Sequence, residues 1–194
     1  MTRLNEEFEV VIPSIKENIL TTDSIPENIP VHIIGEGTIN EARNIGVSKS
    51  NAETIVILDD DLSFDKSTLY DIVDMVDENT LVGMAEDTVG LILGRSMVFK
   101  KSLWRDIGGF DERLMSHNGD TDFAIRSKKN NYEIKRFPQS WFYHEEHSRS
   151  VTTFDRAWRL AYLCIKHPNW APHLIDSFLL KPHFPWIRMW SSRN

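Results

Sequence analysis

The chain has 194 residues, of which 41% are hydrophobic and 26% are charged, and its formal net charge is −7. This is the composition of a globular protein with one sizeable core, and the acidic balance argues against a nucleic acid held by a general basic surface. A nucleotide is not excluded, because one metal ion can neutralise a diphosphate locally. The single cysteine, Cys164, allows no intrachain disulfide and fits a reducing compartment. We find neither a membrane-spanning stretch nor a signal-peptide pattern, and therefore expect a cytoplasmic protein, with the inner face of the membrane as the alternative.

Strands and helices alternate in the first half of the chain. Short apolar runs at 8–13, 31–34 and 54–58 predict strands. Between the second and third runs, residues 38–50 suit a helix, and Thr38 with Glu41 has the spacing of a capping box. The other elements predicted here are a helix after Asp65, with apolar residues at 69, 72, 73 and 76, and strands at 81–85 and 91–99. This alternation predicts an α/β fold with helices flanking a central sheet.

The second half combines short elements with an aromatic-rich end. A helix is predicted at 120–129, followed by strands at 132–137 and 141–143. A helical stripe of apolar residues then predicts a core-facing helix; it comprises Phe154, Trp158, Ala161, Tyr162 and Ile165. We expect one domain over 1–167 and an appended tail over 168–194. The tail mixes tryptophan and phenylalanine with basic residues, which suits packing on the domain, packing on a second subunit in a homo-oligomer, or peripheral membrane contact.

Three consecutive aspartates, Asp59, Asp60 and Asp61, directly follow the apolar run at 54–58. In open α/β sheets, ligands bind beyond the carboxyl ends of the strands. Clustered carboxylates repel one another, and a hard divalent cation removes that conflict. The junction therefore predicts a Mg²⁺ or Mn²⁺ site that also takes a substrate phosphate. The alternative is that these aspartates serve only a turn or a helix cap.

Two further groups carry polar side chains that could act in catalysis. Asp120 and Asp122 flank Thr121 after the flexible pair Asn118-Gly119, and His144 follows an aromatic strand. Taken singly, Asp120 has a competing interpretation as a helix N-cap, and for His144 a hydrogen-bonded surface histidine is the favoured interpretation.

Read in order, however, these segments resemble glycosyltransferase family 2. The Asp-x-Asp pattern at 59–61 and the Gly-Gly-Phe-Asp-Glu run at 108–112 are the most specific parts of the resemblance. The other matching stretches are residues 10–14, 42–46, 119–126 and 143–144. The resemblance implies one GT-A-like (Rossmann-like) domain with a mostly parallel sheet, in which about 8–100 binds the nucleotide sugar and about 101–150 carries the acceptor and catalytic part. It also implies an inverting transferase that uses a nucleotide-diphosphate sugar, with polysaccharide or lipid-linked glycan acceptors among those of the family.

The resemblance also assigns roles to single residues. Asp120 matches the general base, with Asp122 as the alternative, and Asp61, Asp59 and His144 match the metal site. The residues expected beside the nucleotide sugar are Pro13, Ser14, Glu36, Arg43, Asn44, Asp59, Asp60 and Arg149, of which Arg149 is proposed only from its closeness in sequence to His144.

Two departures from the family pattern leave alternatives open. Glu36, between Gly35 and Gly37, stands where many members have paired aspartates, and Gly119 stands where a glutamate commonly precedes the catalytic aspartate. A degenerate nucleotide- or partner-binding domain without catalysis is therefore the first alternative. A nucleotidyltransferase is less favoured, because the segment after Pro13 lacks a glycine-rich phosphate loop, and a calcium-binding structural domain would leave 108–112 unexplained.

Overall fold

The computed structural model describes residues 7–85, 90–115, 118–145 and 153–183. The chain divides into two compact units, one formed by 1–85 with 91–147 and the other by 86–90 with 148–194. The predicted boundary between 167 and 168 falls inside the second unit.

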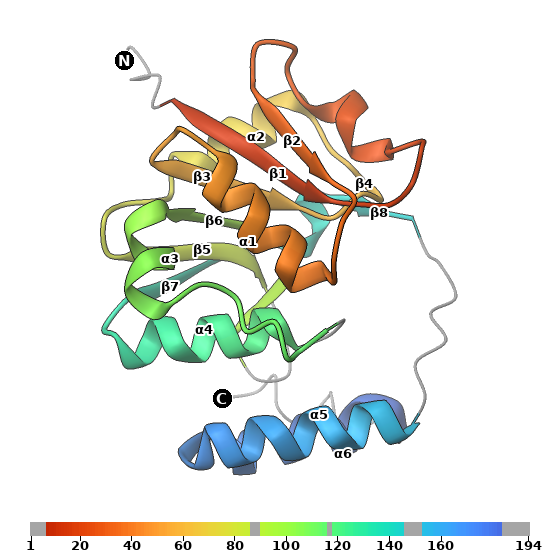
Figure 1. Cartoon of the computed structure of the whole chain (residues 1–194), viewed down its shortest axis with the longest axis vertical. Coiled ribbons are helices and arrows are strands. Elements are labelled where there is room, and N and C mark those ends of the chain that lie inside the picture. Colours follow the sequence, from red (N-terminus) through yellow and green to blue (C-terminus); the bar gives the residue numbers. More distant parts are fainter. Residues whose placement is uncertain (1–6, 86–89, 116–117, 146–152, 184–194) are drawn as a thin grey trace. The chain divides into compact units, whose positions relative to one another are not determined.

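The first unit is built on a six-stranded sheet (Figure 1). Five strands run in one direction and the fourth in spatial order, β6, runs antiparallel to both of its neighbours. In spatial order the strands are β2 (Val31–Ile34), β1 (Phe8–Pro13), β3 (Thr54–Leu58), β6 (Ile92–Lys100), β5 (Thr80–Ala85) and β7 (Glu133–Phe137). The predicted mostly parallel α/β sheet is confirmed.

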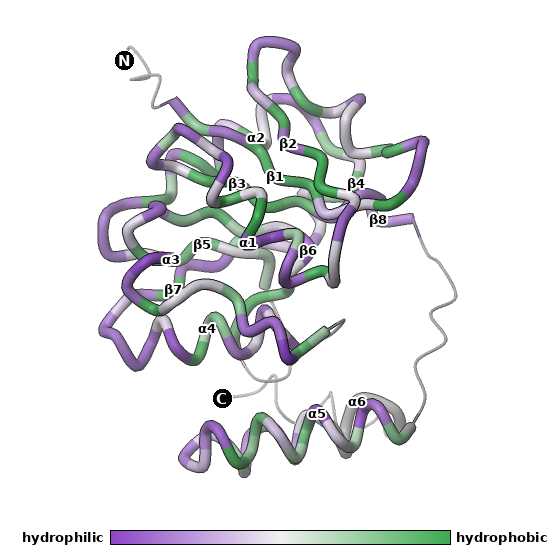
Figure 2. Tube along the Cα trace, viewed as in Figure 1, coloured by the Kyte–Doolittle hydropathy of each residue, from purple (hydrophilic) through white to green (hydrophobic). Residues whose placement is uncertain are grey.

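Helices cover both faces of this sheet. Val11 of β1 faces α1 (Ile39–Lys49), where it lies directly against Gly46. The neighbouring Val10 belongs to the opposite core, together with Ile72 of α2 (Lys66–Val73). Burial on both faces explains why the strands read as continuous apolar runs, as Figure 2 shows along β1 and β3. The remaining helices of this unit are α3 (Lys101–Ile107) and α4 (Gly119–Lys129).

A small second sheet closes the region beyond β3. It consists of β4 (Leu62–Ser63) and β8 (Tyr143–His144), which pair antiparallel so that Leu62 lies opposite His144. A short 3-10 helix, η1 (Leu20–Ser24), lies against β4. This pairing brings His144 to the residue that follows the acidic triplet.

Local signals predicted most of these elements, and some predictions were wrong. The capping box of α1 is present, with Glu41 N donating to Thr38 Oγ1 and Thr38 N donating to Glu41 Oε2. The strand predicted at 141–143 is instead a 3-10 helix, η2 (Gln139–Trp141), followed by β8. The helix after Asp65 ends at Val73, one turn before Val76.

The second unit is a helical hairpin. It contains α5 (Thr153–Lys166), a 3-10 turn η3 (Pro168–Trp170) and α6 (Ala171–His183). Leu163 of α5 and Leu174 of α6 are buried. The predicted core-facing stripe was wrong in its direction, because Phe154, Trp158 and Ile165 are 80%, 62% and 81% exposed. Within the described residues, no helix combines the length and apolar character that a membrane span requires.

Candidate active site at the carboxyl edge of the sheet

The acidic triplet forms a turn whose backbone is fixed from both sides. Asp59 N donates to Arg95 O at 2.8 Å, which continues the pairing of β3 with β6. The buried hydroxyl of Thr21 donates to Asp59 O at 2.6 Å and accepts from Leu62 N at 3.0 Å. Thr21 therefore clamps both ends of the turn. This role could not be predicted, because Thr21 lies in a polar segment without periodicity.

The three carboxylates diverge toward different partners, which relieves the repulsion expected from their adjacency. Asp61 Oδ2 lies 3.2 Å from His144 Nε2, and these side chains are only 5% and 15% exposed. Glu145 N donates to Asp61 O at 3.1 Å, so the strand pair β4–β8 fixes both groups. The carboxylate suits Mn²⁺ or Mg²⁺, and the additional imidazole nitrogen favours Mn²⁺ over Mg²⁺, which prefers oxygen ligands.

A metal at this pair would need further ligands. Over the described ranges, no three His, Cys, Asp or Glu side chains gather in a group that could hold a metal ion alone. Mg²⁺ is commonly held by one or two carboxylates, with substrate phosphates and water completing the octahedron. The pair of Asp61 and His144 fits that arrangement.

Asp60 points to the loop that follows β1. Ser14 Oγ donates to Asp60 Oδ2 at 2.5 Å, and Lys16 Nζ lies 2.8 Å from Asp60 Oδ1. The hydrogen bond to Asp60 raises the pKa of Lys16; partial burial opposes this, and the charges of Asp60, Asp61 and Glu145 add to it. Lys16 thus places a cation beside the triplet. Sequence reasoning missed it, although it stands two residues after Ser14.

Asp59 faces a buried cation on α1. Arg43 Nη2 lies 3.5 Å from Asp59 Oδ1 and donates to Gly94 O at 2.9 Å. Gly94 N in turn donates to Asp120 Oδ2 at 2.6 Å. A Cβ at Gly94 would stand 2.8 Å from the Asp120 Cβ and 3.0 Å from Arg43 Nη2, so only glycine allows this approach. Through Arg43 and Gly94 the structure links the end of β3 to the start of α4.

Asp120 is not the helix cap that one reading of the sequence expected. Asn118, in the left-handed region at φ 66°, is the N-cap of α4, and Asp120 lies in the first turn. Its Oδ1 accepts from Thr121 N at 2.8 Å and its Oδ2 accepts from Gly94 N. Each oxygen keeps a second lone pair, and the side chain is partly exposed. Asp120 is therefore an oriented carboxylate with capacity to accept a proton.

Asp122 has a different environment. It is fully buried, and its Oδ2 lies 2.7 Å from Arg126 Nε one helical turn later. Arg126 Nη1 also donates to Ile107 O at 2.5 Å, which ties α4 to the end of α3. This environment gives Asp122 a structural pairing, and a substrate hydroxyl has better access to Asp120.

The unusual Gly119 has a direct structural counterpart in Asn40 of α1. A Cβ at position 119 would lie 2.2 Å from Asn40 Nδ2 and 2.3 Å from Asn40 Oδ1. Asn40 is fully buried, and its Nδ2 donates to Leu114 O at 2.7 Å and Asp111 O at 3.0 Å. The asparagine amide thus occupies the space of a residue-119 side chain. Gly119 and Asn40 are 79 positions apart in the sequence, so local patterns could not predict their contact.

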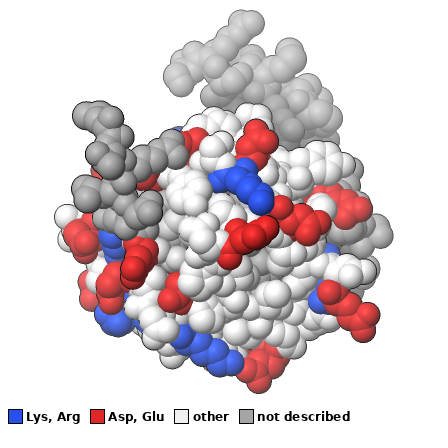
Figure 3. Space-filling model, turned by 90° about the horizontal axis from the view of Figure 1, so that it is seen from above, with Lys and Arg blue, Asp and Glu red and all other residues white. Residues whose placement is uncertain are grey.

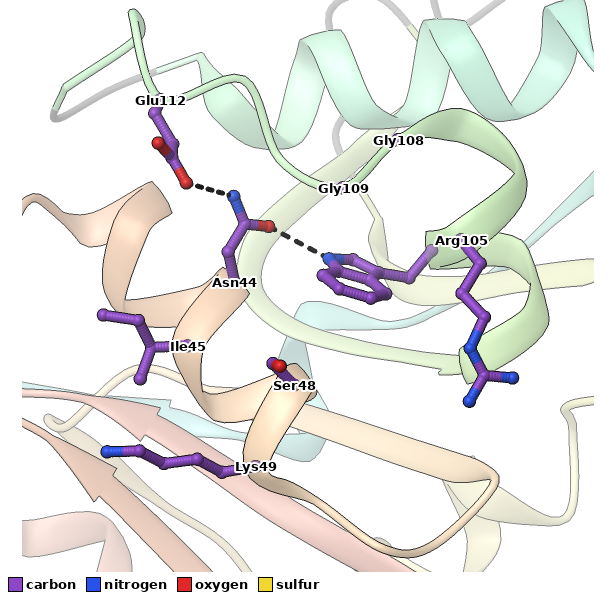
Figure 4. Close-up of a pocket in the computed structure, with 9 residues that line it drawn as sticks. Asn44, Ile45, Ser48, Lys49, Arg105, Gly108, Gly109 and Glu112 are labelled. Carbon is purple, nitrogen blue, oxygen red and sulfur yellow. Dashed lines mark hydrogen bonds between the residues drawn. The ribbon is translucent and has the colours of Figure 1, made fainter.

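Asn44 serves the Gly-Gly-Phe-Asp-Glu turn rather than the acidic triplet. Its Oδ1 accepts from Phe110 N at 2.8 Å and Trp104 Nε1 at 3.0 Å, and its Nδ2 donates to Phe110 O at 2.9 Å and Glu112 Oε1 at 2.8 Å. These bonds fill the amide's donor and acceptor positions. Asn44 lines a surface pocket of about 640 Å³, in which Figure 4 shows its hydrogen bond to Glu112. Neither the acidic triplet nor Asp120 lines this pocket.

The turn itself joins α1 to α4. Phe110 stacks on Phe123 with ring centroids 4.1 Å apart, and the Arg43 guanidinium lies 5.4 Å from the Phe110 ring centroid. Gly109, at φ 73°, could carry no side chain without meeting Asn44. The motif therefore holds in place the two helices that carry Arg43 and Asp120.

The remaining predicted site residues lie around the ends of β1 and β2. Pro13 ends β1 opposite Ile34, which places Ser14 at the carboxyl edge. Glu36 is exposed, with Oε1 3.6 Å from Lys49 Nζ, so it forms a surface pair. Arg149 lies outside the described residues.

Charge on the surface agrees with the acidic composition. Figure 3 shows acidic side chains spread over one face, with basic side chains gathered at a few places. On the face that Figure 3 shows, the described residues form no continuous basic stripe of the kind typical of nucleic-acid binding.

The fold has many counterparts among solved structures. The mannosyltransferase PcManGT from Pyrobaculum calidifontis, in complex with GDP-Man and Mn²⁺, is 15% identical at a TM-score of 0.62, over 96% of this chain and 73% of that one. TarS residues 1–349 from S. aureus, in complex with UDP, is 15% identical at a TM-score of 0.59, over 82% of this chain and 65% of that one. Glucosyl-3-phosphoglycerate synthase from Mycobacterium tuberculosis, in complex with Mg²⁺ and UDP, is 11% identical at a TM-score of 0.61, over 82% of this chain and 79% of that one. At these identities the likeness shows a shared GT-A fold.

Sequence comparison places the chain in a family. A search of curated protein sequences finds no match. The family model for glycosyl transferase family 2, in contrast, matches residues 27–127, just over half of the chain. The matched range contains the acidic triplet, the Gly-Gly-Phe-Asp-Glu turn and both Asp120 and Asp122. The chain therefore belongs to glycosyl transferase family 2 and is a glycosyltransferase.

Proposed function

We propose that this transferase moves a sugar from a nucleotide-diphosphate donor to an acceptor hydroxyl in one inverting displacement that depends on a divalent metal. One observation carries the proposal. The buried pair of Asp61 and His144 and the oriented carboxylate of Asp120 belong to one connected edge of the sheet, joined through Arg43 and Gly94.

Asp120 is the proposed general base. As the acceptor oxygen attacks the anomeric carbon, its proton passes to a free lone pair of the Asp120 carboxylate. The bond between the anomeric carbon and the diphosphate oxygen breaks on the opposite side, so the sugar inverts its configuration. The backbone N–H groups of Gly94 and Thr121 hold the carboxylate in orientation throughout.

The departing diphosphate gathers negative charge, which the other edge residues would offset. Asp61 and His144 would hold the metal, with Asp59 nearby, and a bound Mn²⁺ or Mg²⁺ supplies charge stabilisation to the leaving oxygen. Lys16 provides a side-chain cation beside the same carboxylates. The complexes of PcManGT with GDP-Man and Mn²⁺, and of the M. tuberculosis synthase with Mg²⁺ and UDP, support the use of a divalent metal together with a nucleotide, and we place both at this edge.

The structural reason for Gly119 removes one ground for a degenerate domain. Because Asn40 fills the space beside Gly119, the absence of a side chain at residue 119 has a steric reason and leaves Asp120 in place. For the acceptor we propose a hydroxyl of a glycan or of a lipid-linked glycan. We place the reaction in the cytoplasm or at the inner face of the membrane.

Thermal unfolding with a set of nucleotide sugars and Mn²⁺ tests the proposal. A donor that binds only the native state stabilises it by mass action, by about 2.7 kcal/mol at a hundredfold excess over its dissociation constant. We expect UDP- or GDP-sugars to raise the midpoint with Mn²⁺ and to be turned over to the nucleoside diphosphate. NMR of the product should show inverted anomeric configuration. A chain that binds no nucleotide sugar, or binds one without any turnover once acceptors are supplied, would contradict the proposal.

A further inference from the structure

One face of α5 is apolar and faces away from its helical partner. Phe154, Trp158, Ala161 and Ile165 follow one another at spacings of four, three and four residues, which places them on one side of a helix. All four are exposed, and three of them are large side chains at 62% to 81% exposure. We call these four residues the α5 stripe. The opposite side carries Leu163, which is fully buried within the hairpin.

Charge separates this part of the chain from the rest. Residues 148–194 carry seven Lys and Arg against two Asp and Glu, a net charge of +5, whereas residues 1–147 carry a net charge of −12. The same 47 residues hold four of the six tryptophans. On α5 itself, Arg156 is exposed, and Arg159 and Lys166 are partly exposed. A basic segment on an acidic protein indicates an anionic partner surface.

We propose that the α5 stripe docks on an anionic lipid surface, with α5 lying in the plane of the interface. Aromatic and aliphatic side chains enter the headgroup region, and the net positive charge of residues 148–194 attracts anionic lipid. A helix of 14 residues is about 21 Å long, too short to span the hydrocarbon core, so contact is peripheral. None of the four stripe residues belongs to the proposed sugar-transfer site, and the binding needs neither metal nor nucleotide.

Two other occupants are less well matched. Among the described residues of the first unit, the large exposed apolar side chains have no helical spacing and form no stripe like that of α5; they are Ile15, Ile33, Met115, Trp141 and Tyr143. A second copy would bring two basic segments together, which charge repulsion opposes.

Co-sedimentation of the full chain with vesicles tests the proposal. Phosphatidylcholine vesicles with phosphatidylglycerol should pull the chain down at low salt, and vesicles of phosphatidylcholine alone should not. Salt should weaken the binding, and Lys166→Gln, directly after Ile165, should lower the partition by roughly fivefold, the scale for one basic residue near an anionic surface. Trp158→Glu and Ile165→Glu should each lower it on the order of tenfold or more. Ile33→Glu, the same type of change at a half-exposed position of β2, is the matched control and should bind like the parent chain.

Each contrary result overturns the proposal. The α5 stripe has no lipid surface to bind if the parent chain stays in the supernatant or binds neutral vesicles equally well. The same conclusion follows if Trp158→Glu binds anionic vesicles as strongly as the parent chain. If light scattering shows a dimer that Trp158→Glu dissociates, the stripe covers a second copy. Circular dichroism of each variant checks that the helices remain, and Ile165→Glu provides an independent variant if Trp158→Glu loses them.

Discussion

The two ends of the same strands use acidic side chains for opposite purposes. At the amino end of β1, the buried Glu9 accepts from Asn51 N at 3.1 Å and Ala52 N at 3.2 Å, and lies 2.6 Å from His32 Nε2. Two of these donors are backbone groups of the turn before β3, so the carboxylate fastens the sheet. At the carboxyl end, Asp60 and Asp61 face side chains that a ligand can rearrange.

The difference lies in which groups satisfy the carboxylate. Backbone N–H groups are fixed by the fold, and removing their acceptor leaves buried donors without a partner. The Lys16 ammonium, by contrast, is a flexible cation that is 44% exposed. Acidic residues at the amino edge should therefore matter for stability, and those at the carboxyl edge for binding and turnover.

The largest effect is expected from Asp120→Asn. The amide keeps the size of the side chain but cannot take a proton, so turnover should fall by about a hundredfold or more while donor binding changes little. Steady-state kinetics together with calorimetry of the donor measure the two quantities separately.

Asp122→Asn is the matched control. It breaks the buried pair with Arg126, so it should lower the free energy of unfolding by about 3 kcal/mol or more, yet leave turnover by the folded fraction nearly intact. If Asp122→Asn abolishes turnover in folded protein and Asp120→Asn does not, the base has been assigned to the wrong carboxylate.

The next effect concerns the support of Asp120. Gly119→Ala should destabilise the chain by about 1–3 kcal/mol, because the new methyl group overlaps the Asn40 amide. Asn40→Ala should cost about 1–3 kcal/mol by leaving the buried carbonyls of Asp111 and Leu114 without their donor. Denaturant unfolding of both single variants and the double variant measures their coupling. In the double variant the overlap is absent, so its loss should be smaller than the sum of the single losses. Strict additivity would show that the two positions do not compete for space.

The smallest effect is expected at the amino edge. Glu9→Gln should lower the free energy of unfolding by about 1 kcal/mol and leave nucleotide binding unchanged.

Burial would raise the pKa of Glu9, but the hydrogen bonds from His32, Asn51 and Ala52 outweigh it and lower the pKa below 4.5. The contribution of Glu9 to stability is therefore complete above pH 4.5 and is lost as the pH falls through the lower pKa of the folded state. Denaturant unfolding between pH 3 and 6 checks this, because Glu9→Gln should show a flatter dependence than the parent chain. An unchanged profile would mean that another carboxylate dominates acid unfolding.

Local patterns in the sequence predicted the sheet and its acidic edge. The run at 54–58 is buried on both faces, so composition alone identified β3, and the capping box identified the start of α1. The helix α3 was missed because it is short and its ends carry no polar capping signal, only Lys100 before it and Gly108 after it.

Features that depend on contacts distant in sequence could not be predicted. The Thr21 clamp and the pair of Asn40 with Gly119 join segments 38 to 79 positions apart. The choice between Asp120 and Asp122 depends on where α4 begins. Because α4 starts at Gly119, Asp120 faces Gly94, and Asp122 faces Arg126. Periodicity identified the α5 stripe as amphipathic, but it did not determine on which side the core lies.

Calorimetry of UDP and GDP binding, with Mn²⁺ and with a chelator, tests the account most directly. The parent chain and Asp120→Asn should bind one of these diphosphates only when the metal is present. Asp61 and His144 supply too few ligands to hold the metal without the phosphate, and the phosphate is attracted too weakly when the metal is absent. Asp61→Ala should lose this metal-dependent binding. Equal affinity in the chelator, or an unchanged affinity in Asp61→Ala, would contradict a metal–diphosphate site at the end of β3.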